Sequence, residues 1–147
     1  MKILDKTTDD YLLETGIDAL HSQSMEWLED IAFWRDESAF LYALEMRKTL
    51  KSVPVDAKNK IRKIEDELIK ISGGDLDDLY DEVEKHEQYL DRMLESKRED
   101  EEPYREKHKQ IADKVNRFDK RFRNLKRAIF ELVKTHKAQL VTDAPGK

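Results

Sequence analysis

Apolar side chains recur at alternating intervals of three and four residues throughout the last third of this chain. The stripe comprises Tyr104, His108, Ile111, Val115, Phe118, Phe122, Leu125, Ile129, Leu132 and His136. A stripe that repeats every seven residues lies along one face of an α-helix and packs lengthwise against other helices at a shallow, left-handed angle. The spacing therefore predicts a packed helix from Pro103, which suits a first helical turn, to about Lys137.

A second stripe runs through the first third of the chain, with no convincing stop before Ser52-Val53-Pro54. It comprises Leu13, Ile17, Leu20, Ser24, Trp27, Ile31, Trp34, Ser38 and Leu41, and His21, Met25, Leu28, Ala32, Ala39 and Tyr42 widen it. We expect one long helix with a wide buried face, capped by Thr7 or Thr8. Gly16 costs such a helix about 1 kcal/mol relative to alanine, which packing can offset.

The middle third carries two apolar stripes separated by Ser72-Gly73-Gly74-Asp75. The stripes are Ala57, Ile61, Ile64, Leu68 and Ile71, and then Leu76, Leu79, Val83, His86, Leu90 and Met93. Pro54 ends the preceding helix, and Asp56 is a candidate cap for this one. If Gly73-Gly74 interrupts a single helix, the chain has three long helices; if it reverses the chain, there are four shorter ones.

The fold class expected from these stripes is all-α. We favour an elongated antiparallel bundle of three long helices with the middle one interrupted at Gly73-Gly74, because the three segments then match in length. The alternative is an up-down four-helix bundle. The expected organisation is an N-terminal tail over residues 1–7, a single helical-bundle domain over 8–137 and a flexible C-terminal tail over 138–147.

Composition limits the class of protein further. Charged residues make up 41% of the chain and hydrophobic residues 38%, a balance typical of long helices when the periodicity is strong. The absence of cysteine excludes disulfides, thiolate metal sites and cysteine nucleophiles. The first ten residues, MKILDKTTDD, lack the apolar stretch of a signal peptide, and no apolar run approaches the roughly 20 residues that span a bilayer. We expect a cytoplasmic protein that does not bind membranes.

Charge is distributed unevenly along the chain. Residues 1–52 carry about −5, residues 53–74 about +1, residues 75–102 about −9 and residues 103–147 about +8. Opposite charges attract, so we expect the acidic third segment to lie beside the basic last helix. The acidic segment would repel phosphates, so no nucleic-acid partner is expected. The basic residues that such a partner would need are Lys114, Arg117, Lys120, Arg121, Arg123, Lys126 and Arg127.

All four histidines lie on or beside an apolar stripe. Reversals near Val53 and Asp100 would bring His21 and His86 face to face, place Val115 at the same level and leave His108 about two turns away. Glu26, Glu82 and Glu87 would then be within a turn or two of the two histidines. Imidazoles and carboxylates are common ligands of transition metal ions, so His21, His86, Glu26, Glu82 and Glu87 form a candidate metal site. The alternative is that the imidazoles fill polar layers of the bundle and no cofactor is bound.

Several short patterns resemble a family of small uncharacterised helical-bundle proteins of Bacteroidetes-type bacteria. They are Leu20-His21, Trp27-Leu28, Ile31, Phe33-Trp34, Arg35-Asp36-Glu37 and His86-Glu87. The chain departs from that family at Ser24, where the family has a further histidine, and at Gly73-Gly74, where its helix is uninterrupted. The resemblance implies a helical bundle in a bacterial cytoplasm and attracts attention to His21 and His86, but it implies no activity.

No phosphate-binding glycine loop, di-iron Glu-x-x-His pair or serine elbow occurs in the sequence. The expected function is therefore that of a non-enzymatic helical scaffold or protein-interaction module, with a protein partner or a second copy of itself. The alternative is a metal-binding or sensing bundle that uses His21 and His86.

Overall fold

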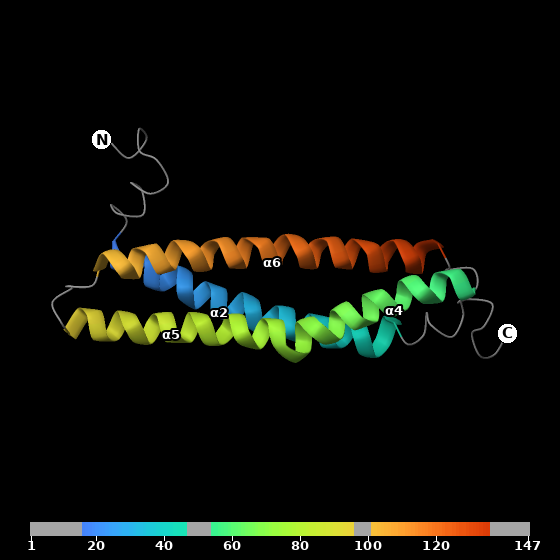
Figure 1. Ribbon diagram of the computed structural model, residues 1–147, viewed down its shortest axis with the longest axis horizontal. Coiled ribbons are helices and arrows are strands. Elements are labelled where there is room, and N and C mark those ends of the chain that lie inside the picture. Colours follow the sequence, from blue (N-terminus) through green and yellow to red (C-terminus); the bar gives the residue numbers. More distant parts are fainter. Residues whose placement is uncertain (1–15, 47–53, 96–100, 136–147) are drawn as a thin grey trace, which may run out of the picture. The chain divides into compact units, whose positions relative to one another are not determined.

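The computed structural model describes residues 16–46, 54–95 and 101–135, and every element in them is helical (Figure 1). The elements are α2 (Ile17–Phe40), the π-helix η2 (Leu41–Met46), α4 (Val55–Lys70), the π-helix η3 (Ile71–Asp75), α5 (Leu76–Glu95) and α6 (Glu101–Thr135). These described ranges contain no β-strand, which confirms the predicted all-α bundle. No helix in them combines the length and the apolar character needed to cross a bilayer.

The described residues form two compact units, and each unit draws on all three helical stretches. Unit 1 comprises residues 16–32, 78–95 and 101–117, and unit 2 comprises residues 33–46, 54–77 and 118–135. The predicted single domain stays a prediction. The predicted tails, the caps Thr7 and Thr8, and the stripe residues Leu13 and His136 lie outside the described residues.

The middle of the chain is one continuous helical stretch, because α4 passes through η3 directly into α5 (Figure 1). Gly73 and Gly74 lie within η3, and the flanking residues Ile71 and Leu76 both have right-handed helical backbone angles. The predicted interruption is therefore a local change from α-helical to π-helical hydrogen bonding. The four-helix alternative is wrong, because it requires the chain to reverse at this point.

Unit 1 buries a compact apolar core. It contains Ile17, Leu20, Leu90, Met93 and Tyr104, with Tyr89 packed against it. Within this unit α5 and α6 run antiparallel: Tyr104 stacks with Tyr89, whereas Lys114, further along α6, pairs with Glu82, which is earlier in α5. The two helices therefore pack as an antiparallel helical hairpin, and α2 contributes Ile17 and Leu20 to the same core.

Unit 2 combines an apolar core with ion pairs. Its buried residues include Ala57, Ile61, Ile64, Leu68 and Ile71 from the middle stretch and Phe118, Phe122 and Ile129 from α6. Arg121 Nη2 lies 2.5 Å from Glu67 Oε1, and Arg121 Nη1 lies 2.8 Å from Asp75 Oδ2. The Arg121–Asp75 pair, and the Lys114–Glu82 pair of unit 1, confirm that the acidic segment faces the basic last helix.

The predicted stripes are the buried faces of the helices. Every position of the two middle stripes is buried, and in α6 the described stripe residues are buried except Leu125 and Leu132, which are half-buried. Full burial of a Leu, Ile or Phe side chain stabilises a fold by about 1.5–3 kcal/mol. The heptad spacing therefore identified most of the side chains that hold each unit together.

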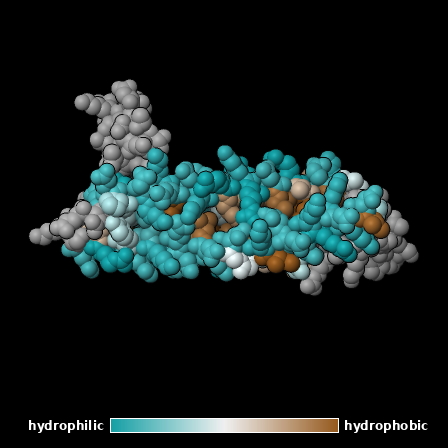
Figure 2. Space-filling view, in the orientation of Figure 1, coloured by the Kyte–Doolittle hydropathy of each residue, from teal (hydrophilic) through white to brown (hydrophobic). Residues whose placement is uncertain are grey.

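The wide buried face predicted for the first helix is wrong. α2 buries a narrow face around Leu20, Trp27 and Ile31, whereas His21, Met25, Ala32 and Ala39 are exposed. The apolar stripe of α2 is thus broader than the surface that its neighbours within each unit cover. Figure 2 shows apolar patches on an otherwise largely hydrophilic face.

The predictions that Gly16 lies inside a helix and that Asp56 caps one are also wrong. α2 begins at Ile17, and Gly16 precedes it, in agreement with the poor helix propensity of glycine. The cap position of α4 is Pro54, with φ −62° and ψ 162°, and Asp56 lies in the first turn. Proline suits this position because its fixed φ is compatible with a helix start and the first turn does not require its missing N–H.

Candidate functional site

Two histidines lie in the buried core of unit 1 and are hydrogen-bonded to each other. His86 on α5 is 3% exposed and His108 on α6 is 0% exposed. His86 Nε2 lies 3.0 Å from His108 Nδ1, and His108 Nε2 lies 2.7 Å from the side-chain oxygen of Gln23 on α2. We refer to these three residues as the His–His–Gln chain. It links all three helical stretches of the unit and ends at an exposed residue, Gln23.

Aromatic rings enclose both imidazoles. The ring of Tyr104 stacks on His86 with centroids 4.3 Å apart and planes 3° apart. The ring of Trp27 lies 4.5 Å from that of His108, tilted by 30°. These contacts keep water away from the imidazoles, which makes their ionisation in place costly.

Burial lowers the pKa of both histidines to about 4. The Lys107 ammonium, and His108 when it is protonated, lower the pKa of His86 further, and the Arg105 guanidinium does so for His108. Both imidazoles are therefore neutral at neutral pH, and each carries a single ring proton. Burial likewise raises the pKa of the Tyr104 phenol well above its ordinary value, with the Glu87 carboxylate acting in the same direction.

The hydrogen bonds fix the position of each proton. Because the Gln23 oxygen accepts, His108 Nε2 carries the proton of that ring and His108 Nδ1 is left to accept from His86 Nε2. His86 Nδ1 is then a bare acceptor. It is buried, and it has no hydrogen-bond partner within the described part of the chain.

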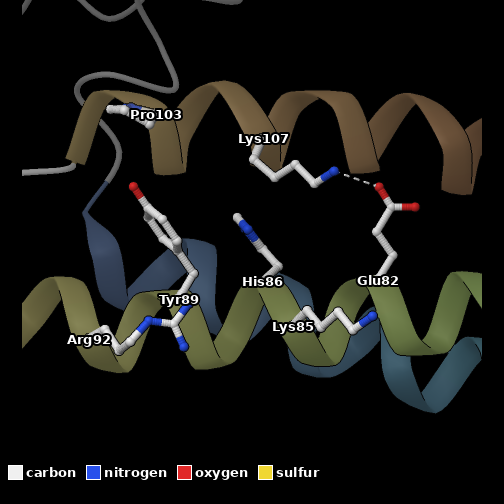
Figure 3. Close-up of a pocket in the computed structure, with 7 residues that line it drawn as sticks. All are labelled: Glu82, Lys85, His86, Tyr89, Arg92, Pro103 and Lys107. Carbon is white, nitrogen blue, oxygen red and sulfur yellow. Dashed lines mark ion pairs between the residues drawn. The ribbon is translucent and has the colours of Figure 1, made fainter.

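A pocket of about 390 Å³ lies beside His86 and is partly open to solvent (Figure 3). Its lining is Glu82, Lys85, His86, Tyr89 and Arg92 from α5, with Pro103 and Lys107 from α6. His86 and Tyr89 project from α5 toward α6 in this view. The guanidinium carbon of Arg92 lies 5.9 Å from the centre of the Tyr89 ring, within range of a cation–π contact. The volume falls within the range of small-molecule sites.

Positive charge exceeds negative charge in this pocket. Its one carboxylate, Glu82, lies 2.8 Å from Lys107 Nζ and 2.9 Å from Lys114 Nζ. Burial raises the pKa of Glu82, but the hydrogen bonds and charges of the two lysines outweigh burial and leave the pKa below its ordinary value. Lys85 and Arg92 form no ion pair with other described residues. The ionised Glu82 thus neutralises cations of α6 and leaves the two cations of α5 unmatched.

The five predicted metal ligands do not converge. His21 Nδ1 lies 2.5 Å from Glu87 Oε2 at a half-exposed position, whereas His86 bonds to the other buried histidine. Glu82 is held by lysines, and Glu26 is exposed. In the described ranges no group of three or more His, Asp or Glu side chains is arranged to hold a metal ion. The structure therefore gives His21 and His86 different partners, and metal binding stays a prediction.

The predicted alignment of the hairpin is wrong by seven residues. His86 lies against His108, whereas the sequence argument placed Val115 at this level. Seven residues are two helical turns, so the predicted alignment placed His108 two turns away from His86, whereas in the structure the two residues are in contact.

Sequence reasoning also missed Gln23 and the cations of the pocket. α5 contains two basic residues, Lys85 and Arg92, in an otherwise strongly acidic helix. With Tyr89 they follow an i, i+4, i+7 spacing, which places all three on one face. That spacing could have identified the pocket residues from the sequence, since two cations on one face of an otherwise acidic helix indicate that they line the same site.

No protein-family model matches this chain, and comparison with curated proteins and with solved structures finds no similar protein. The resemblance to a Bacteroidetes-type family therefore stays a prediction, and functional argument must rest on the geometry of the two units.

Proposed function

We propose that this chain is a non-enzymatic helical interaction module that associates with a second copy of itself. The observation that carries the proposal is a pair of exposed aromatic side chains on α2 in unit 2. Phe33 is 64% exposed and Phe40 is 55% exposed, and they lie seven residues apart on one face of the helix. Burial of a large aromatic side chain is favourable relative to leaving it in water, so a cluster of such exposed side chains commonly marks a docking surface.

Two faces of unit 2 have complementary character. The acidic-aromatic face of α2 consists of Phe33, Asp36 and Phe40, all exposed. The basic-aromatic face of α6 consists of Arg127, Phe130 and Lys134, with Phe130 63% exposed. Helical spacing puts the members of each set on one side of their helix.

The acidic-aromatic face of one copy fits the basic-aromatic face of another. Carboxylate would then face guanidinium and ammonium groups, which favours this pairing over contact between two identical faces. If both contacts form between the same two copies, the interface is self-complementary and closes as a symmetric dimer. The exposed parts of six phenylalanine rings would supply roughly 600–900 Å² of buried area. That is most of the roughly 1,000 Å² that a specific interface requires.

Sedimentation velocity over a wide range of protein concentration tests the proposal. The unmodified chain is expected to dimerise, and Phe33→Glu/Phe40→Glu and Phe130→Glu are each expected to give monomers. Leu94→Glu is the matched control, because Leu94 is 49% exposed but lies in unit 1, and it is expected to dimerise normally. Circular dichroism verifies that each variant remains helical.

A charge exchange tests the pairing of the faces. Asp36→Lys should weaken association, and adding Arg127→Glu to the same chain should restore it. A monomeric unmodified chain, or a dimer that is indifferent to all three phenylalanine substitutions, would contradict the proposal.

A further inference from the structure

We propose that the pocket beside His86 binds a small organic anion, with its anionic group held by Lys85 and Arg92 and its apolar part against Tyr89 and Pro103. The site lies within unit 1 and shares no residue with the proposed dimer interface in unit 2. It therefore adds a small-molecule ligand to a chain proposed above as an interaction module.

The basic residues of α5 are gathered at this pocket. α5 contains eight acidic residues and two basic ones, and both basic residues line this pocket while a single acidic residue does so. That residue, Glu82, is already paired with Lys107 and Lys114. An anion entering the pocket therefore does not have to displace a carboxylate from Lys85 or Arg92. The two cationic groups lie apart along α5 and would turn toward each other to hold one anionic group (Figure 3).

The lining of the pocket also has apolar surfaces. Tyr89 and Pro103 give the pocket apolar surfaces from both helices, and Tyr89 also stacks with the buried ring of Tyr104 at a centroid distance of 6.4 Å. Arg92 lies over the Tyr89 ring, so a flat ligand in the pocket would contact an aromatic face and a guanidinium group together. Inorganic anions lack the apolar body that would use these surfaces.

A buried imidazole lies beside the pocket. His86 lines the pocket, is 3% exposed and has a ring nitrogen without a hydrogen-bond partner. A buried acceptor that lacks a donor is unfavourable. That nitrogen has almost no accessible surface, so the charges and the apolar surfaces of the lining define the ligand class, a small organic anion with an apolar part.

Titration with phenyl phosphate, followed by amide chemical shifts in NMR spectra at low salt, tests the site. At neutral pH this probe is mainly a dianion that carries an aromatic ring, because the second pKa of a phosphate ester is about 6, so it tests the charged and the apolar contacts of the site. Saturable shifts are expected at residues 82–92 of α5 and 103–107 of α6. Benzyl alcohol, which is neutral, should produce no saturable shift there, and inorganic phosphate should bind at least about tenfold more weakly than phenyl phosphate.

Paired variants separate this pocket from general attraction of anions. Lys85→Ala/Arg92→Ala should weaken binding of phenyl phosphate by at least about tenfold, since each charged hydrogen bond contributes that much. Lys60→Ala/Lys63→Ala removes the same charge from a groove of unit 2 and should change binding less than about twofold. Three results would each overturn the proposal: no saturable shift, equal binding of inorganic phosphate, or an equal effect of both double variants.

Discussion

Acidification below pH 6.5 should destabilise this protein, because unit 1 holds two neutral histidines in its core. Burial lowers the pKa of His86 and of His108 to about 4 in the folded chain, whereas an unfolded chain has the ordinary value of 6.5. Below pH 6.5 the unfolded state therefore binds more protons than the folded state. The contribution to stability is complete above pH 6.5 and is lost as the pH falls from 6.5 toward 4.

The size of the loss follows from the two pKa values. At about pH 5 each histidine costs the folded state roughly 2 kcal/mol relative to about pH 8, so the pair costs roughly 4 kcal/mol. Domains commonly have a total stability of about 5–15 kcal/mol, so such a loss is readily measured. Glu82 adds little in this window, because its pKa is lowered from 4.5 and its contribution is lost at lower pH.

Urea unfolding followed by far-ultraviolet circular dichroism at about pH 8 and about pH 5 measures this difference. The unmodified chain should lose roughly 4 kcal/mol, and His86→Gln/His108→Gln should lose much less between the same two conditions. Ile111→Ala is the control: it creates a cavity beside the histidines, costs about 2–5 kcal/mol at either pH and leaves the difference unchanged. Equal losses for the double variant and the unmodified chain would refute the assignment of neutral histidines.

Two further substitutions test unit 2 and the middle helix. Gly73→Ala/Gly74→Ala should raise the free energy of unfolding by about 1–2 kcal/mol, because an added Cβ at either position meets no atom within 4 Å and alanine favours a helix. A lower midpoint of urea unfolding would contradict the view that η3 tolerates side chains. Arg121→Ala should lower the free energy of unfolding by about 0.5–1 kcal/mol, since the guanidinium pairs with Glu67 and Asp75 at partly exposed positions. Added salt should reduce the difference in stability between the variant and the unmodified chain, and a difference that salt does not change would indicate lost packing instead.

The apolar spacing predicted the fold well because burial depends mainly on where a side chain lies around its helix. Positions such as Ile61, Val83 and Phe122 are buried in the structure for that reason. The same spacing failed for α2, where Met25 and Ala32 continue the stripe but remain exposed. A stripe shows which side chains can be buried, and the number of neighbours that cover a helix depends on tertiary packing that one sequence does not specify.

The candidate site was harder to predict because its members come together only in one alignment of the helices. A slip of seven residues between α5 and α6 moves each apolar stripe onto itself, so apolar burial hardly distinguishes the two alignments. The polar groups do distinguish them. In the observed alignment His86 and His108 are hydrogen-bonded to each other, whereas the slipped alignment would set His86 against the apolar Val115 and leave both imidazoles buried without that bond.

Each buried polar group left unpaired costs about 1–3 kcal/mol, so the His–His–Gln chain stabilises the observed alignment over the slipped one by several times the thermal energy. A buried polar layer of this kind commonly sets register in coiled coils. The same layer explains why the pocket forms where it does, because the alignment that pairs His86 with His108 also brings Pro103 and Lys107 opposite Tyr89 and Glu82. The residues that fix the register therefore also determine which cations and rings line the proposed anion site.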